Sequence, residues 1–189
     1  MRFSRPRFTH ASRPWANRGL TLIELLVTLA LAALLLRLAL PAYDDWIASI
    51  RVMQEAQHLA ASMNTARSEA IKRGVRVNLC KSVNGLQCTP GSLWHGGWIM
   101  HVDADASGQL EAVTDLIRAR EAVEPGVTVS ANRPLADYVS YTAFGHARML
   151  NGALQIGTMT VCGHNQRAVN VVLSAGGRPR IAKTALICP

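Results

Sequence analysis

The residues best suited to chemistry are two arginines near the C-terminus, in the segment Gly177-Arg178-Pro179-Arg180. In an extended chain, residues i and i+2 point to the same side about 6.5–7 Å apart, close to the separation of neighbouring phosphates along one nucleic-acid strand. Pro179 keeps the segment extended and removes a backbone donor, so we expect a loop or an edge strand. Gly176 and Gly177 let the backbone approach a surface closely. The segment therefore has the chemistry of a polyanion-binding site.

Basic residues are concentrated toward the C-terminal end of the chain. Residues 20–124 hold nine Lys or Arg and eleven Asp or Glu, whereas residues 125–189 hold six basic residues and one acid, Asp137. The basic residues that could widen the patch around the paired arginines are Arg148, Arg167 and Lys183. This asymmetry is typical of a surface that binds a polyanion, and a plain solvated surface is the alternative. The formal charge of +8 overstates the asymmetry, because five arginines precede residue 20.

No group of residues has the pattern of a catalytic or metal site. The histidines are scattered, a GxSxG segment is absent and no carboxylate pair is suggested, so we expect no enzyme and no cofactor. The turn at 103–108 is similar to the first half of a calcium loop, but its twelfth position is Thr114 instead of a bidentate glutamate. Cys162 and His164 form an isolated C-x-H pair, without a CxxC. We therefore expect a solvated hairpin turn and no metal centre.

An apolar run of 21 residues, 20–40, is long enough to cross a bilayer as a helix of about 30 Å. The arginines before it predict a cytoplasmic N-terminal end, with the rest of the chain outside. A cleaved secretory signal is the alternative, but the run exceeds a usual signal core and no small-residue cleavage site follows it. Glu24 lies inside the run, where a carboxylate is costly unless it is paired. Its presence requires a partner or a purpose.

Hydrophobic periodicity predicts that the helix continues beyond Pro41 over residues 41–74, and Gly74 provides the stop signal. The apolar stripe consists of Trp46, Ile47, Ile50, Met53, Ala56, Leu59, Ala60, Met63, Ala66, Ala70 and Ile71. Strand-like segments follow, bounded by Gly, Asn and Pro, at 76–81, 98–102, 127–130, 138–144, 153–161 and 168–173. A long helix packed on antiparallel strands is an α+β fold, with a β-rich globular domain at 75–189.

Four cysteines, Cys80, Cys88, Cys162 and Cys188, lie in the part of the chain expected outside the cytoplasm, where disulfides persist. Three pairings are possible. We favour Cys80–Cys88 with Cys162–Cys188, because each bond joins neighbouring segments. The second bond would tie down the extreme C-terminus.

The stretch Gly19-Leu20-Thr21-Leu22-Ile23-Glu24-Leu25 resembles the class III signal of type IV pilins and pseudopilins. The resemblance implies that residues 1–19 are a leader, that a prepilin peptidase cuts after Gly19, and that Leu20 is then N-methylated. It implies a single-pass inner-membrane protein whose globular domain lies in the periplasm before it joins a pilus or pseudopilus. Glu24 would neutralise the N-terminal amine of a neighbouring pilin subunit, and such a buried charge pair fixes register at a cost in stability.

The order of landmarks along the whole chain resembles the FimT/GspH family of minor pilins and minor pseudopilins. The matching pieces are Arg67-Ser68-Glu69-Ala70, Gly97-Trp98-Ile99-Met100 with the acidic turn after it, Tyr141-Thr142-Ala143-Phe144-Gly145, and Cys162 leading to Gly176-Gly177-Arg178. The family fold is a long helix with two small antiparallel sheets, which agrees with the α+β expectation from the periodicity.

The resemblance implies two alternative functions. FimT-like members linked to natural transformation carry a GRxR motif, and Gly177, Arg178 and Arg180 match it. This implies a minor pilin that binds extracellular DNA for uptake. No aromatic residue lies within the segment, so we expect sequence-independent contact with the phosphate backbone. The alternative is a GspH-like minor pseudopilin with a structural role in a type II secretion pseudopilus.

Overall fold

The computed structural model describes residue 19 and residues 21–189, and the chain divides into two units, Met1–Pro41 and Ala42–Pro189. One α-helix, α1 (Leu22–Arg73), runs through both units. In its first part the apolar side chains are exposed, among them Leu25, Leu29 and Leu35. Within residue 19 and residues 21–189, no helix is long and apolar enough to cross a membrane.

The two ends of α1 follow from local sequence. The Thr21 hydroxyl accepts a hydrogen bond from the backbone N–H of Glu24 at 3.3 Å, and the Thr21 carbonyl accepts one from Leu25, so Thr21 caps the N-terminus. At the other end, Gly74 has φ +69° and its N–H donates to the Ala70 carbonyl at 3.0 Å. A left-handed glycine that follows the last turn is the usual helix stop, and the expected end at Gly74 is confirmed.

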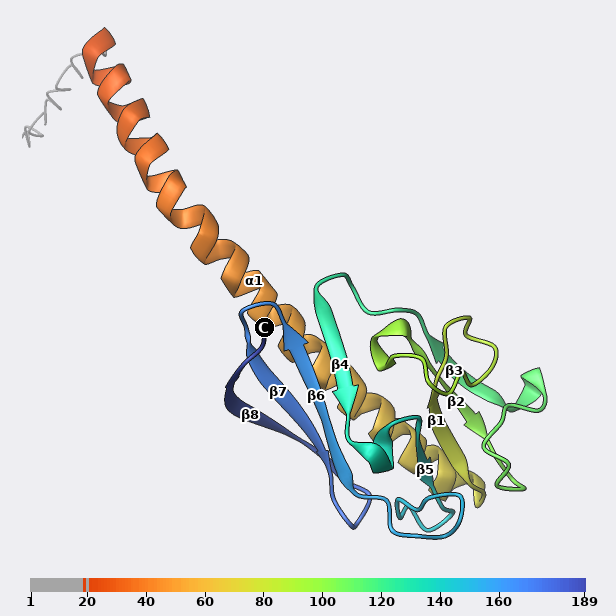
Figure 1. Ribbon diagram of the computed structural model, residues 1–189. Coiled ribbons are helices and arrows are strands. Elements are labelled where there is room, and N and C mark those ends of the chain that lie inside the picture. The colour runs from red at the N-terminus through yellow and green to blue at the C-terminus, as the bar shows by residue number, and fades with distance from the viewer. Residues whose placement is uncertain (1–18, 20) are drawn as a thin grey trace, which may run out of the picture. The chain divides into compact units, whose positions relative to one another are not determined.

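The strands form two four-stranded antiparallel sheets (Figure 1). The first has the order β3-β2-β1-β5, and its strands are β1 (Val77–Lys81), β2 (Trp98–Val102), β3 (Leu116–Arg120) and β5 (Tyr138–Tyr141). The second has the order β4-β6-β7-β8, and its strands are β4 (Val127–Ala131), β6 (Gly157–Gly163), β7 (Arg167–Leu173) and β8 (Pro179–Ile187). Three short 3₁₀ helices lie in the connections, η1 (Trp94–Gly96), η2 (Val113–Asp115) and η3 (Arg133–Leu135). The α+β expectation is confirmed.

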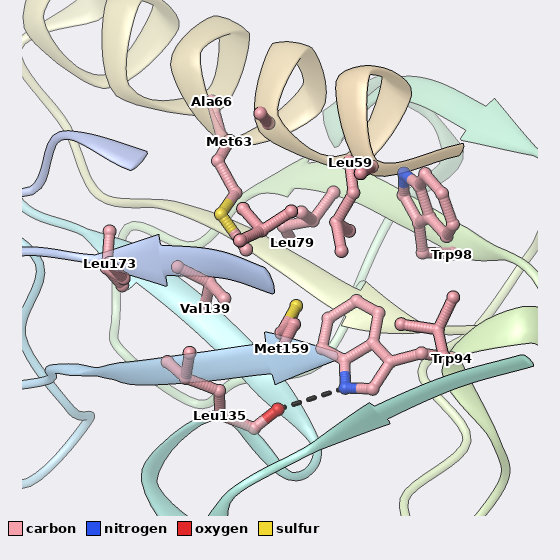
Figure 2. Close-up of a cluster of buried hydrophobic side chains, with 14 of the residues drawn as sticks. Leu59, Met63, Ala66, Leu79, Trp94, Trp98, Leu135, Val139, Met159 and Leu173 are labelled. Carbon is pink, nitrogen blue, oxygen red and sulfur yellow. Dashed lines mark hydrogen bonds between the residues drawn. The ribbon is translucent and has the colours of Figure 1, made fainter. Parts of the chain in front are cut away.

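The core lies between the second half of α1 and both sheets. The α1 side chains in it are Val52, Ala56, Leu59, Ala60, Met63, Ala66 and Ala70, each at most 7% exposed. Figure 2 shows Leu59, Met63 and Ala66 above side chains of both sheets, and the Trp94 indole N–H donates to the Leu135 carbonyl at 2.9 Å. The small residues on α1 let the strands approach closely while Leu59 and Met63 fill the space between them.

Two ends of the expected stripe were wrong. Trp46 and Ile71 are 59% and 48% exposed. Trp46 lies six residues before Val52, the first fully buried residue among those described in α1, whereas Ile71 follows the fully buried Ala70 and lies at the side of the buried face, next to Gly145. All six expected strands are present: the strand over 98–102 has the expected ends, and the other five have shifted ends. Strand β3 was not expected, and β8 is the edge strand that was one of the two expectations for the Pro179 segment. The strand expected over 138–144 ends at Tyr141, because residues 142–145 form a tight turn in which the Gly145 N–H donates to the Thr142 carbonyl.

Candidate functional site

The paired arginines lie where the hairpin of β7 and β8 turns. The Gly177 N–H donates to the Ser174 carbonyl at 2.9 Å, and the Ser174 N–H donates to the Arg178 carbonyl at 3.2 Å. The Ser174 hydroxyl donates to the same Arg178 carbonyl at 2.9 Å. These bonds close a compact turn over residues 174–178, which fixes the backbone on which Arg178 stands.

Strand β8 is an edge strand, as the proline in the motif predicts. Pro179 pairs with Leu173 and Arg180 with Val172 across the ladder. Val171 is fully buried and Val172 is only half-buried, so the alternation places Arg180 on the sheet face turned away from the core. Arg178 and Arg180 are both exposed. The structure thus presents two guanidinium groups to solvent, two residues apart, at one end of the sheet.

Gly177 is buried, and the close approach it permits is to the protein's own backbone rather than to a ligand. A Cβ at this position would lie 2.5 Å from the Gly145 carbonyl oxygen and 3.1 Å from the Ala147 nitrogen. Its φ of +74° is also in the left-handed region. Gly176 is exposed, and a Cβ there would meet nothing within 4 Å. Gly177 therefore docks the turn on the loop after β5 and positions Arg178 indirectly.

The other three basic residues of the expected patch are placed differently. Arg148 is half-buried beside the docked loop, and its carbonyl accepts a hydrogen bond from Arg76 at 3.2 Å. Arg167 begins β7 and lies about 17 Å along the strand from the level of Arg180. Lys183 pairs with Val169 on the core-facing side of β8.

Arg167 and Lys183 line a groove instead of the outer surface. The groove has a volume of about 620 Å³ and lies between α1 and the β7–β8 hairpin, where Asp45 and Met53 also line it. The expectation of one patch holds only for Arg178 and Arg180, with Arg148 adjacent. Lys183 is separated from Arg180 because it lies on the opposite face of β8. Arg167 is separated from Arg180 because it lies near the other end of the hairpin.

Beneath the docked turn lies a buried tyrosine. The Tyr141 ring is fully buried, and its Cε1 is 3.3 Å from the position a Cβ on Gly177 would take. Burial raises the pKa of the Tyr141 hydroxyl well above its usual range, and the nearby Arg67 guanidinium opposes that shift only in part. The hydroxyl oxygen has no hydrogen-bond partner among the described residues. Tyr141 therefore acts as neutral packing under the turn.

Both expected disulfides are present. Cys80 is bonded to Cys88 with a Cα–Cα distance of 5.6 Å, and Cys162 to Cys188 with 5.7 Å. The second joins β6 to the residue that follows β8, and the Cys188 N–H donates to the Gln166 carbonyl at 2.9 Å. The edge strand is thus held at one end by the docked turn and at the other end by a covalent bond.

One group of metal-ligand atoms occurs within the described ranges, formed by Cys80, Cys88 and His101. Both sulfurs belong to the disulfide, so neither is a thiolate that could bind an ion. The acidic turn holds itself together: the Asp103 carboxylate accepts from the Gly108 N–H at 3.2 Å and from Asn78 at 2.5 Å. Cys162 is likewise bonded and offers no ligand atom beside His164.

At the N-terminus the structure describes Gly19 and Glu24, whereas Leu20 and the five arginines that precede Gly19 lie outside the described residues. Gly19 is exposed, with nothing within 4 Å of its Cβ position. Glu24 is exposed in the first turn of α1, three residues after the Thr21 cap. A carboxylate at this position is stabilised by the positive end of the helix dipole. Glu24 thus has a local role at the start of α1.

The aromatic side chain that sequence reasoning missed is Phe144. It lies in the loop on which Gly177 docks and is 82% exposed. The sequence separates it from Arg178 by more than thirty positions, so only the docking contact reveals their proximity. The only signal in the sequence was a large apolar residue immediately before a glycine, Gly145.

A long helix that begins within a Gly-Leu-Thr-Leu-Ile-Glu stretch and packs on two small antiparallel sheets defines a pilin-like protein. A model of the family described as type II transport protein GspH matches residues 55–177, and the chain belongs to this family. The prokaryotic N-terminal methylation motif matches residues 16–36.

Two curated relatives match the chain over part of its length. Fimbrial protein Q of Moraxella bovis is 35% identical over 82 residues, which is 43% of this chain and 52% of that protein. Pilin-like protein PilA1 of Thermus thermophilus is 37% identical over 91 residues, or 48% and 51%. The chain spans about half the length of these relatives.

The crystal structure of the type IV minor pilin FimU of Pseudomonas aeruginosa has the same fold. Its TM-score is 0.52 at 18% identity, and the alignment covers 69% of this chain and 87% of that one. At this identity the likeness concerns the fold alone. It supports the pilin-like architecture and says nothing of a ligand.

Proposed function

We propose that this protein is a type IV minor pilin that binds extracellular DNA without sequence specificity, for uptake in natural transformation. The observation that carries the proposal is the pair Arg178 and Arg180, both exposed on a turn and edge strand that are held at both ends. Side chains fixed on a rigid backbone lose less conformational entropy when they bind phosphate. Arginine is also well suited to phosphate oxygens, because its planar group donates two parallel hydrogen bonds.

The surrounding charge supports the same proposal. No Asp or Glu occurs after Asp137, so the chain segment that builds β6, β7 and β8 brings no opposing charge to the arginines. Arg148 adds a positive charge in the adjacent loop. Contact with phosphates alone carries no sequence information, so similar affinity for unrelated sequences is expected.

In this proposal, the N-terminal part of the chain attaches the protein first to the inner membrane and then to the filament. A prepilin peptidase removes residues 1–19 after Gly19, and Leu20 is methylated. Residues 20–40 anchor the chain once through the inner membrane, residues 41–74 continue the helix, and residues 75–189 form the periplasmic domain. Support comes from the methylation motif at residues 16–36, the exposed apolar side chains of early α1 and the two disulfides. In the filament, Glu24 faces the N-terminal amine of a neighbouring pilin.

The test measures DNA affinity as a function of salt. The full chain, purified in detergent, is titrated with duplexes of unrelated sequence at several salt concentrations. If each arginine neutralises one phosphate, Arg178→Ala with Arg180→Ala lowers the slope of log affinity against log salt by up to about two units. Both side chains are exposed, so the melting temperature should change little.

A matched control removes the same charge elsewhere. Arg118 lies exposed on β3, the edge strand of the other sheet, and Arg133 is exposed in η3. The double change Arg118→Ala with Arg133→Ala also lowers the net charge by two. It should leave the salt slope within about half a unit of the unchanged protein, because these residues lie outside the proposed site. Equal effects of the two double variants would mean that net charge alone attracts DNA, and would reject the site.

The second candidate function is that of a GspH-like minor pseudopilin with a structural role in a type II secretion pseudopilus. The observation that favours it is the match of the GspH family model over residues 55–177. On this alternative, the Arg178 and Arg180 variant binds DNA as the unchanged protein does. Deletion of the gene would reduce secretion without reducing transformation.

A further inference from the structure

Phe144 is the most exposed large hydrophobic side chain in the described part of the chain, at 82%. A single exposed apolar residue is common on a protein surface and needs no explanation by itself. Two further observations suggest a role for Phe144: hydrogen bonds hold the turn that carries it, and the arginine turn docks on that same loop at Gly177.

The turn that carries Phe144 is fixed by several contacts. The Gly145 N–H donates to the Thr142 carbonyl at 2.8 Å, and the Thr142 N–H donates to the His146 carbonyl at 3.0 Å. The Arg67 Nε donates to the Gly145 carbonyl at 2.8 Å, which ties the turn to the last part of α1. Space beneath Gly145 is filled, because a Cβ there would lie 2.6 Å from Ile71 Cδ1. The Phe144 ring therefore stands on a fixed backbone and is presented to solvent.

The arginine turn docks directly on this loop, at the lower end of the view in Figure 1. Gly177 touches the Gly145 carbonyl, and Phe144 and Arg178 are each one residue from that contact. With consecutive Cα atoms 3.8 Å apart, the Cα atoms of Phe144 and Arg178 lie within about 14 Å of each other. An extended single strand covers this distance in a few nucleotides. An exposed aromatic side chain and the exposed Arg178 thus extend from two backbone segments that touch each other, and Arg180 follows two residues later.

We propose that Phe144, Arg178 and Arg180 together form a binding platform for single-stranded DNA, in which a base stacks on the Phe144 ring and the arginines hold neighbouring phosphates. The inference rests on the proposed function, since it uses the same two arginines. Base stacking on an aromatic ring is tolerant of sequence, because every base has a π-face. In a duplex, both faces of each base are already stacked on their neighbours. The Phe144 ring therefore adds affinity for single strands and none for duplex DNA.

The experiment compares two forms of one sequence. A fluorescein-labelled oligonucleotide without self-complementarity, and the same strand annealed to its complement, are titrated with the full chain in detergent by fluorescence anisotropy at several salt concentrations. Phe144→Ala should weaken single-strand binding about 5- to 140-fold, as expected for the loss of one stacked base. Duplex affinity should stay within about twofold.

The salt dependence separates stacking from charge. Stacking releases no counterions, so Phe144→Ala should leave the single-strand salt slope unchanged, whereas each arginine contact contributes about 0.7 to it. Phe144→Trp should restore single-strand affinity, because it keeps an aromatic face. Leu186→Ala serves as the matched control, because it removes a different exposed apolar side chain, one that lies on β8. It should leave the affinities for single-stranded and duplex DNA unchanged.

Three results would overturn this inference. Phe144→Ala could bind single strands as the unchanged protein does, which removes the ring from the site. An equal loss for duplex and single strand would mean that Phe144 only supports the turn. Unchanged DNA affinity together with loss of copurifying pilins would make the ring a protein contact. If the double arginine variant loses DNA binding and Phe144→Ala does not, only the stacking inference fails; if neither variant changes DNA binding, the proposed function fails as well.

Discussion

Replacement of Gly177 by alanine tests whether the arginine turn is docked as the structure shows. The residue is buried with φ +74°, and a Cβ would lie 2.5 Å from the Gly145 carbonyl oxygen. That atom belongs to a turn held by Thr142 and Arg67, so it cannot give way without breaking hydrogen bonds. The neighbouring Gly176 is exposed and its Cβ position is open, which makes Gly176→Ala a matched control one residue away.

The expected magnitude has two parts. A left-handed conformation costs an alanine about 1–2 kcal/mol relative to glycine. Forced backbone and side-chain movement around an added methyl group costs about 1–3 kcal/mol more. The sum, about 2–5 kcal/mol, corresponds to a fall in melting temperature of roughly 5–15 °C for a unit of this size. Gly176→Ala should change the unfolding free energy by no more than about 0.5 kcal/mol.

Thermal melts followed by circular dichroism compare the two variants at one pH and one salt concentration. Gly177→Ala should melt well below Gly176→Ala, and its duplex affinity should fall because Arg178 is displaced. If the two variants melt within about 2 °C of each other, the turn is not docked on residues 142–147. The proximity of Phe144 to Arg178 would then lose its basis.

Other parts of the domain give three further predictions. The Lys81 ammonium and the Gly91 N–H hold the pKa of Asp137 below its usual range, so the stability it contributes is present above about pH 4 and is lost as the pH falls through its folded pKa. Urea melts should show Asp137→Asn less stable than the unchanged protein at pH 7, with the difference shrinking as the pH falls below about 4. Opening the disulfide by Cys162→Ala with Cys188→Ala should cost about 3–4 kcal/mol in the chain-entropy view, and denaturant melts would contradict this if the midpoint did not move. Arg120→Met should destabilise the protein more than Glu55→Gln does. The Glu55 side chain is 6% exposed and the Arg120 side chain 31%, so Arg120→Met leaves a buried carboxylate without its partner at 2.7 Å. A lower melting temperature for Glu55→Gln than for Arg120→Met would contradict the assigned pair.

Features that depend on local sequence were predicted well. The end of α1 at Gly74 needs only a glycine after a periodic helix, and most of the buried stripe follows from spacing alone. The two disulfides followed from the sequence proximity of the segments they join. The errors at Trp46 and Ile71 arise because periodicity shows which face is apolar but neither where the covered part of the helix begins nor how wide the buried face is.

Features that depend on register were not predictable. Strand β8 contains Arg180, Ile181, Lys183 and Leu186, whose polar and apolar residues do not alternate cleanly, because an edge strand is exposed on more than one side. A strand predicted over 179–187 would already have placed Arg180 and Lys183 on opposite faces, because they are three residues apart, but the register is needed to tell which of the two faces the core. The proximity of Phe144 to Arg178 depends on a loop-to-loop contact at Gly177, which no pattern of hydrophobic residues encodes.

The charged residues of β8 also have a purely structural explanation, and the position of Arg178 distinguishes it from DNA binding. An exposed edge strand invites pairing with another chain, and a proline with lysine or arginine on the strand protects it. Pro179, Arg180 and Lys183 all fit that role, since each lies within β8. Arg178 does not, because it precedes the strand in a closed turn that presents no ladder to a partner. If the charges only protect the edge, Arg180→Ala should promote aggregation and Arg178→Ala should have no effect on either aggregation or DNA affinity. If both arginines bind phosphate, the single changes should each lower the salt slope by a similar amount, about 0.9 for duplex DNA, whatever their effect on aggregation.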